Sequence, residues 1–206
     1  TEVNLPYNLE YLGNGAFDTC LSLKEINISQ NDNYTSSDGV LFNRDLSILL
    51  LFPESRIGSY TVPVSVTEIG DFAFCTSRLS EVFMYNVKKI GKYAFSGSTI
   101  TSIVLPNSIV EINENAFNAC TSLSYVKLPE EITEIRKGTF RQTMCLKSIE
   151  LPDSITSIED RAFENGGLES IVIPENVTVI GEYAFRNCKY LTDVMISDIL
   201  AENINT

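Results

Sequence analysis

The feature that most constrains this chain is a short apolar pattern that returns about every 22 residues. Each unit closes on a phenylalanine that follows a small residue, at Phe17, Phe74, Phe95, Phe117, Phe140, Phe163 and Phe185. Subtracting successive positions from Phe74 onward gives steps of 21, 22, 23, 23 and 22 residues. A fixed period of this length predicts a solenoid, in which one structural unit stacks on the next.

A second sequence motif recurs in the same register as the phenylalanines. Runs of the form L-x-x-I-x-L occur at residues 23–28, 79–84, 100–105, 123–128, 146–151, 168–173 and 191–196. Proline follows several of these runs, as at Pro106 and Pro129, and it marks a strand end because it has no N–H for a ladder. An aliphatic pair such as Ile109 and Ile112 then precedes the phenylalanine. Each repeat therefore predicts a first strand, a proline turn, a second short strand and a tight turn.

The segments 69–74, 90–95 and 180–185 all read I-G-x-x-A-F. Together with the L-x-x-I-x-L-P runs, they resemble the BspA-type, or treponemal, class of bacterial leucine-rich repeats over nearly the whole chain. The chain departs from the pattern where Arg136 and Glu159 replace the glycine and Thr139 replaces the alanine, which puts the local turn geometry in question. The expected fold is α/β: a curved, right-handed leucine-rich-repeat solenoid, rich in strands, with two short strands per repeat and short helical turns.

Residues 29–60 form an irregular repeat without an Ala-Phe mark. The apolar runs 40–42 and 46–52 flank a turn-rich triplet as hairpin arms do, and BspA-type proteins look similar here. Either the hairpin edges the concave face and shapes a site, or its strands stay in the stack; the arms are too apolar to stand in water, which favours the stack. We expect one domain over residues 1–206, with a partial or capping repeat at 191–206.

Composition excludes several functions. The chain has no histidine, which removes Ser-His-Asp and Cys-His catalysis and His-ligated zinc. A net charge of -12 with scattered Lys and Arg argues against nucleic acid, and no apolar run is long enough to insert in a membrane. The pairs Glu130/Glu131 and Glu159/Asp160 lie in turns, where solvated charge is expected rather than acid–base catalysis. We predict no enzymatic activity, no cofactor and no metal site; the Asp/Asn-rich run at 31–38 lacks the closing Glu of an EF-hand.

The five cysteines do not predict a disulfide framework or a thiolate metal site, because their number is odd and no C-x-x-C spacing occurs. Cys20, Cys120 and Cys188 each lie three residues after a repeat phenylalanine, which is the Cys position of BspA-type repeats. We expect these three to pack as small buried groups. Cys75 and Cys145 fall outside this register, and the sequence leaves open whether either one pairs or reacts.

Alternation within the first strands predicts which side chains point outward. Three consecutive repeats place apolar or aromatic residues there, and the resulting candidate binding patch comprises Glu81, Phe83, Tyr85, Val104, Tyr125 and Lys127. A contiguous apolar patch rimmed by charges is typical of a protein-binding hot spot. The alternatives are that the preceding hairpin covers Phe83 and Tyr85, or that the patch is a contact between copies of the chain.

The family resemblance implies a secreted or cell-surface bacterial protein, with a signal peptide removed, that recognises or adheres to a protein ligand through its concave face. Host matrix or plasma proteins and other bacterial surface proteins are the partner classes that this resemblance implies. A structural stalk and an intracellular regulatory scaffold are the alternatives. Neither the ligand, the surface anchor nor the oligomeric state can be read from the repeats.

Overall fold

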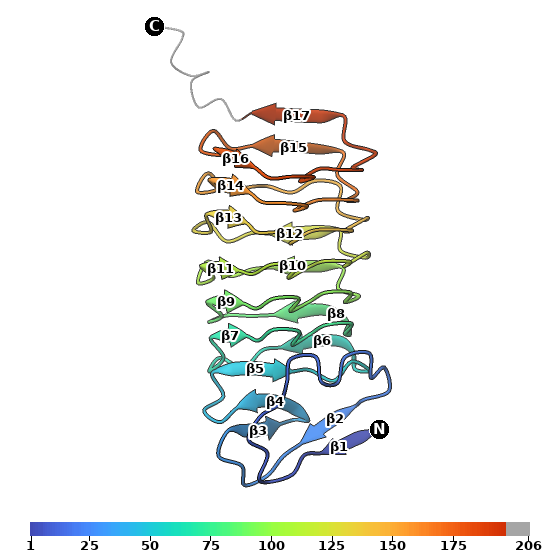
Figure 1. Cartoon of the computed structure of the whole chain (residues 1–206), viewed down its shortest axis with the longest axis vertical. Helices are drawn as coiled ribbons and strands as arrows, with labels where there is room; N and C mark the ends of the chain where they lie inside the picture. Colours follow the sequence, from blue (N-terminus) through green and yellow to red (C-terminus); the bar gives the residue numbers. More distant parts are fainter. Residues whose placement is uncertain (197–206) are drawn as a thin grey trace, which may run out of the picture.

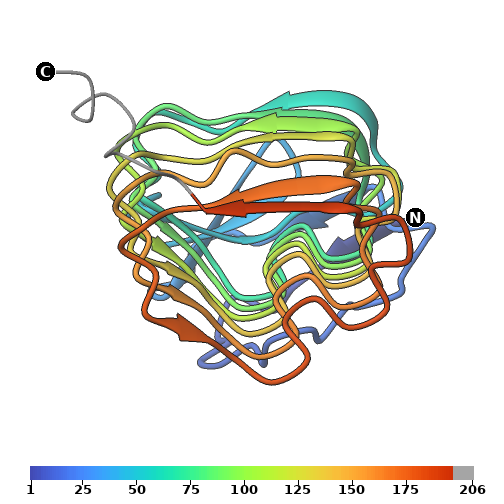
Figure 2. The same ribbon diagram turned by 90° about the horizontal axis from the view of Figure 1, so that it is seen from above.

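The computed structural model describes residues 1–196, so the end of the expected capping repeat, residues 197–206, lies outside the described part. Successive turns of the chain stack along one axis (Figure 1) and follow one another closely when seen from above (Figure 2). Residues 1–196 contain seventeen strands and no helix. The solenoid is confirmed, but the α/β class and the short helical turns expected from the sequence are not.

Eight of the strands belong to one column of the stack, which corresponds to the predicted first strands. Their bounds are β1 (Glu2–Asn4), β2 (Glu25–Asn27), β6 (Ile57–Thr61), β8 (Arg78–Phe83), β10 (Ser102–Val104), β12 (Tyr125–Lys127), β15 (Ser170–Ile173) and β17 (Asp193–Ile196). They pair in parallel only as β1–β2, β6–β8, β10–β12 and β15–β17. The first strand predicted within residues 146–151 is absent, and β6 was not predicted.

The predicted second strands form another column of shorter strands. These are β7 (Glu68–Ile69), β9 (Lys89–Ile90), β11 (Glu111–Ile112), β13 (Glu134–Ile135), β14 (Ser157–Ile158) and β16 (Val179–Ile180). Strands β7, β9 and β11 pair in parallel, as do β13, β14 and β16. Strands β7, β9, β11, β13 and β14 each contribute an inward isoleucine to the core, and those at 69, 90, 135 and 158 are at most 1% exposed, whereas Ile180 of β16 is 52% exposed.

The phenylalanines form a continuous ladder of rings. From Phe74 to Phe185, neighbouring ring centroids lie 4.9 to 5.6 Å apart and the rings are nearly parallel. Three main-chain hydrogen bonds accompany each step; for example, the N–H groups of Asn115, Phe117 and Ala119 donate to carbonyls of the next turn at 2.8 to 3.0 Å. Offset aromatic stacking adds to the burial of apolar area, so this ladder is the core's repeating unit.

Left-handed residues on both sides of each ring explain why no helix forms. One column of positive φ angles runs through Phe72, Tyr93, Asn115, Gly138, Arg161 and Tyr183, and another through Thr76, Gly97, Ala119, Gln142, Asn165 and Asn187. A left-handed residue ends a helical turn, so each tight turn closes without propagating. The departure at Thr139 is accommodated, since its buried hydroxyl donates to the Arg136 carbonyl at 2.7 Å.

The irregular repeat keeps its strands in the stack. Strands β3 (Tyr34–Ser37), β4 (Val40–Asn43) and β5 (Ile48–Leu51) pair antiparallel in that order, and β5 then pairs in parallel with β7. Phe52, which follows β5, lies 5.1 Å from Phe74 and is the first ring of the ladder. Its N–H donates to the Ala73 carbonyl at 2.8 Å, as the Phe74 N–H does to Ala94.

Candidate functional site

The candidate patch lies on the outer side of the first strands, which we call the first-strand face. The alternation prediction is correct here: Phe83 is 44% exposed, Tyr85 60%, Val104 56% and Tyr125 52%. Glu81 and Lys127 are exposed as well. The hairpin therefore does not cover Phe83 and Tyr85.

Strand register arranges these side chains in two columns. Val104 pairs with Lys127 and Ser102 with Tyr125, while Thr61 pairs with Phe83 and Ser59 with Glu81. Strand β8 lies beside β10 and is joined to it by the hydrogen bond from Thr101 N–H to the Ser80 carbonyl, which extends these columns across the two pairs. Phe83, Val104 and Lys127 thus follow one another in one column, with Glu81 and Tyr125 in the other.

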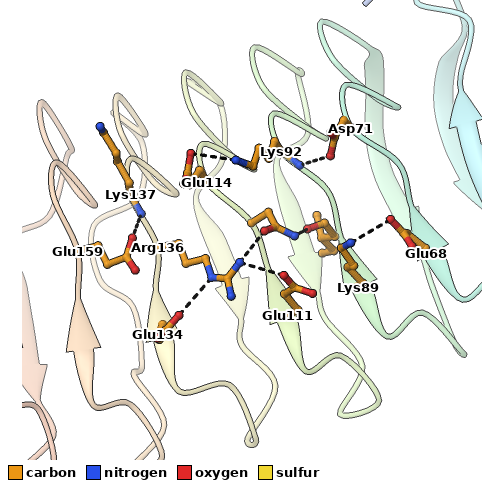
Figure 3. Close-up of polar contacts among 12 residues, drawn as sticks. Glu68, Asp71, Lys89, Lys92, Glu111, Glu114, Glu134, Arg136, Lys137 and Glu159 are labelled. Atoms are coloured by element: carbon orange, nitrogen blue, oxygen red, sulfur yellow. Dashed lines mark hydrogen bonds and ion pairs between the residues drawn. The ribbon is translucent and has the colours of Figure 1, made fainter. Parts of the chain in front are cut away.

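Charged side chains on the second-strand side stabilise the fold instead (Figure 3). The Lys89 ammonium lies 3.4 Å from Glu68 on the preceding turn. The Arg136 guanidinium bonds Glu111 at 2.9 Å and Glu134 at 3.2 Å, and it also donates to the Asn113 side chain. It therefore bridges β11 and β13, two strands that do not pair, and this explains how the turn tolerates Arg in place of Gly.

The polar side chains of the candidate patch have no such partners. Within residues 1–196, no hydrogen bond or ion pair involves the side chains of Glu81, Tyr125 or Lys127. Their polar atoms are consequently available to a binding partner. An apolar strip with unpaired charges at its rim is a suitable surface for protein recognition.

A hollow of about 590 Å³ opens next to the patch, between the turn that contains β12 and the following turn. Its lining includes Tyr125 and Lys127 from the patch, together with the side chains of Glu130, Glu131, Ser148, Glu150 and Asp153. Sequence reasoning missed this hollow. Two sequence features lie in it: Glu150, an acidic residue in an outward position of an apolar repeat, and the pair Glu130/Glu131.

The carboxylates of Glu159 and Asp160 both bind main-chain groups of neighbouring turns. Glu159 accepts the Lys137 N–H at 2.8 Å, and Asp160 accepts the Glu182 N–H at 2.8 Å, so both carboxylates stabilise turns. In the described part of the chain, no three acidic, Cys or His residues are grouped as metal ligands would be. Nor do residues 1–196 contain a helix that is long and apolar enough to cross a membrane.

Of the three cysteines predicted to pack as small buried groups, Cys120 and Cys188 do pack against the phenylalanine ladder. Cys120 is fully buried and donates its Sγ hydrogen to the Phe95 carbonyl at 2.9 Å; half-buried Cys188 donates to Phe163 at 3.0 Å. Cys20 is exposed, contrary to the prediction, because its turn lies outside the regular phenylalanine ladder. Burial raises the pKa of Cys120 and of half-buried Cys75 to about 12, which disfavours the thiolate form of both.

Comparisons with known proteins agree with this geometry. The model of the BspA type leucine rich repeat region matches six copies, over residues 1–48, 50–168 and 156–205. The comparison with curated proteins gives no match.

Solved structures are similar over most of the chain. A leucine rich cell surface protein from Faecalibacterium prausnitzii is 29% identical with a TM-score of 0.68, over 96% of this chain and 48% of that one. The T. pallidum leucine rich repeat protein is 28% identical with a TM-score of 0.64, over 66% of this chain and 68% of that one. The pneumococcal vaccine antigen PcpA has the same fold at 24% identity and a TM-score of 0.75, covering 96% of this chain and 56% of the antigen. The chain thus spans about half the length of the F. prausnitzii protein. With the repeat, the ring ladder and these matches in agreement, the chain belongs to the BspA-type leucine-rich-repeat family.

Proposed function

We propose that this chain is a non-enzymatic recognition module that binds a protein ligand through the first-strand face, which would be the concave side of the solenoid. The observation that most directly supports this proposal is an exposed apolar strip flanked by the unpaired charges of Glu81 and Lys127. The strip comprises Phe83, Tyr85, Val104 and Tyr125. Exposed aromatic side chains at the centre of a patch contribute most to protein–protein affinity. The ligand is a host matrix or plasma protein, or a bacterial surface protein.

The likeness to a leucine rich cell surface protein supports an extracellular or cell-surface location and a role in adhesion. We also propose that residues 1–206 act as one domain. The single-domain proposal is supported by an apolar core that runs continuously from Val40 to Ala184 and by a second, smaller cluster around Ile26 and Leu41. A plain structural stalk is less well supported, because a stalk has no need of an exposed aromatic strip.

The test is capture of host matrix and plasma proteins by the immobilised chain. A Phe83→Ser/Tyr125→Ser variant should lose the captured partner while keeping the wild-type circular dichroism spectrum and melting temperature. The control is Tyr11→Ser/Val110→Ser, which removes two exposed apolar side chains elsewhere and should retain capture. Equal capture by all three proteins, or capture by none, would refute recognition through this patch.

A further inference from the structure

The first-strand ladder is interrupted beside β12. At other turns, the residue that precedes the first strand donates its N–H to the turn before it: Thr101 to Ser80, Ser124 to Thr101, and Glu169 to Lys147, at 2.8 to 3.0 Å. The equivalent bond from Lys147 to Ser124 is absent. Within residues 1–196, the N–H groups of residues 148–151 form no hydrogen bond to any other residue.

Unpaired main-chain groups at a sheet edge are a template for pairing with another extended chain. Residues 148–151 present such an edge, and they also form one wall of the hollow beyond β12. A volume of about 590 Å³ falls within the range of roughly 300 to 1,000 Å³ that is usual for ligand sites. The hollow can therefore hold a short extended segment.

Charge indicates what kind of segment fits. Four carboxylates line the hollow, those of Glu130, Glu131, Glu150 and Asp153, against the single ammonium of Lys127. All four are exposed, and none has an ion pair within the described chain. On the second-strand side, by contrast, the carboxylates of Glu68, Glu111 and Glu134 each have a cationic partner.

We propose that the hollow binds an extended, basic segment of a protein partner. Main-chain groups of the segment pair with residues 148–151, and Lys or Arg side chains at every second position meet Glu130, Glu150 and Asp153, because alternate residues of a strand point the same way. Tyr125 supplies an aromatic face for an arginine side chain. This inference rests on the proposed function and names the partner class: a protein with an exposed basic strand or tail.

The probe is a fluorescein-labelled peptide with the sequence Arg-Val-Arg-Val-Arg-Val, titrated by fluorescence anisotropy in about 50 mM salt, where charge pairing is weakly screened. The variant Glu130→Gln/Glu150→Gln/Asp153→Asn should weaken binding by about tenfold, since each exposed ion pair makes a small contribution and the variant removes three of them. The control Glu10→Gln/Asp32→Asn/Glu182→Gln removes the same net charge from other exposed positions and should bind as wild type does.

A second peptide, N-methylated at every residue, keeps every side-chain charge, but its methyl groups prevent close main-chain pairing along either edge of the strand. It should bind at least tenfold more weakly than the parent peptide. Equal affinity of the two peptides, equal affinity of the two triple variants, or no binding of the parent peptide up to about 1 mM would each overturn the proposal. A Phe83→Ser variant, altered outside the hollow, should bind the peptide normally. Failure of the peptide assay with intact capture of a matrix protein would thus reject this inference alone.

Discussion

The regular turns and the N-terminal segment contain the same repeat phenylalanine in two different environments. Phe117 is fully buried, and its ring stacks between Phe95 and Phe140. Phe17 is partly exposed and packs against a separate small cluster that contains Ile26 and Leu41. The difference shows that the sequence mark alone does not make a core residue: the mark needs an equivalent turn on each side.

The N-terminal segment is held by local polar contacts instead of ring stacking. Asn31 is 2% exposed, and its amide donates to the carbonyls of Tyr7 and Leu9 at 2.8 and 2.9 Å. Its side-chain oxygen accepts the N–H groups of Asn33 and Tyr34. One side chain therefore satisfies four main-chain groups where the periodic hydrogen bonds are missing.

The largest effect is expected in the ring ladder. Phe117→Ala should lower the free energy of unfolding by about 3 to 5 kcal/mol, because neighbouring turns cannot close the cavity without breaking their own bonds. Phe17→Ala should cost about 1 to 2 kcal/mol, as its ring is only partly buried. Urea unfolding followed by circular dichroism measures both values. Equal losses would show that the two environments do not differ energetically.

A smaller effect is expected from Asn31→Asp, which keeps the acceptor and removes both amide donors. Leaving the Tyr7 and Leu9 carbonyls unpaired should cost about 1 to 3 kcal/mol. Hydrogen exchange should accelerate in residues 5–12 while the turns from Phe74 to Phe163 stay protected. Uniform acceleration along the chain would contradict the separation of the two regions.

The junction between the regions contains a buried carboxyl, Glu54. It is 3% exposed and accepts the Thr19 N–H at 2.7 Å, while its second oxygen has no partner. Burial raises the pKa of this carboxyl above its ordinary value. A raised pKa in the folded state means that the contribution to stability is present below the unfolded pKa and is lost as the pH rises through the folded pKa.

The substitution Glu54→Gln should therefore raise the melting temperature at neutral pH and remove part of the decline in stability as the pH rises from below the ordinary carboxyl pKa to neutrality. Gln retains an oxygen for the Thr19 N–H and avoids burying a charge. Thermal melts across this pH range compare the variant with the wild type. An unchanged pH profile would mean that Glu54 does not control the stability of the junction.

The smallest effect concerns backbone strain in the regular turns. Ala119 has a φ of 57°, so Ala119→Gly should stabilise the chain by about 0.5 kcal/mol: relief of left-handed strain slightly exceeds the added entropy of the unfolded chain. The matched change Ala116→Gly, at a buried alanine outside the positive-φ column, should destabilise by about 1 kcal/mol. Differential scanning calorimetry shows whether each variant is more or less stable than the wild type. A loss of stability in both variants would contradict the strain argument.

Much of the fold followed from the sequence because its determinants are local and periodic. The outward positions of Phe83, Val104 and Tyr125 needed only strand alternation. Phe52 was missed as a ladder residue because Leu precedes it and Pro follows it, so the Ala-Phe mark is absent. The helical turns were predicted wrongly because left-handed φ angles at residues such as Tyr93 and Arg161 are imposed by stacking, not by residue type.

The hollow could not be predicted for a different reason. The run at 146–151 has the same apolar pattern as those that form β10 and β12, and the inward residues Leu146 and Ile149 are buried as expected. Whether neighbouring turns come close enough to form a ladder depends on the rotation between them, which no local pattern encodes. The family resemblance was confirmed, whereas the binding role of the patch stays a proposal.

The unequal bonding of the two sides of the solenoid has a mechanical consequence. Between Phe74 and Phe185, every step along the rings has three main-chain hydrogen bonds, whereas the first strands form ladders only within separate pairs, and β8 and β10 are joined by the single bond from Thr101 to Ser80. Such a rod resists extension along its ring side and yields more easily on the other, so it bends in one preferred plane. A pulling force would widen the gaps between strand pairs first, and binding on that face would respond to tension.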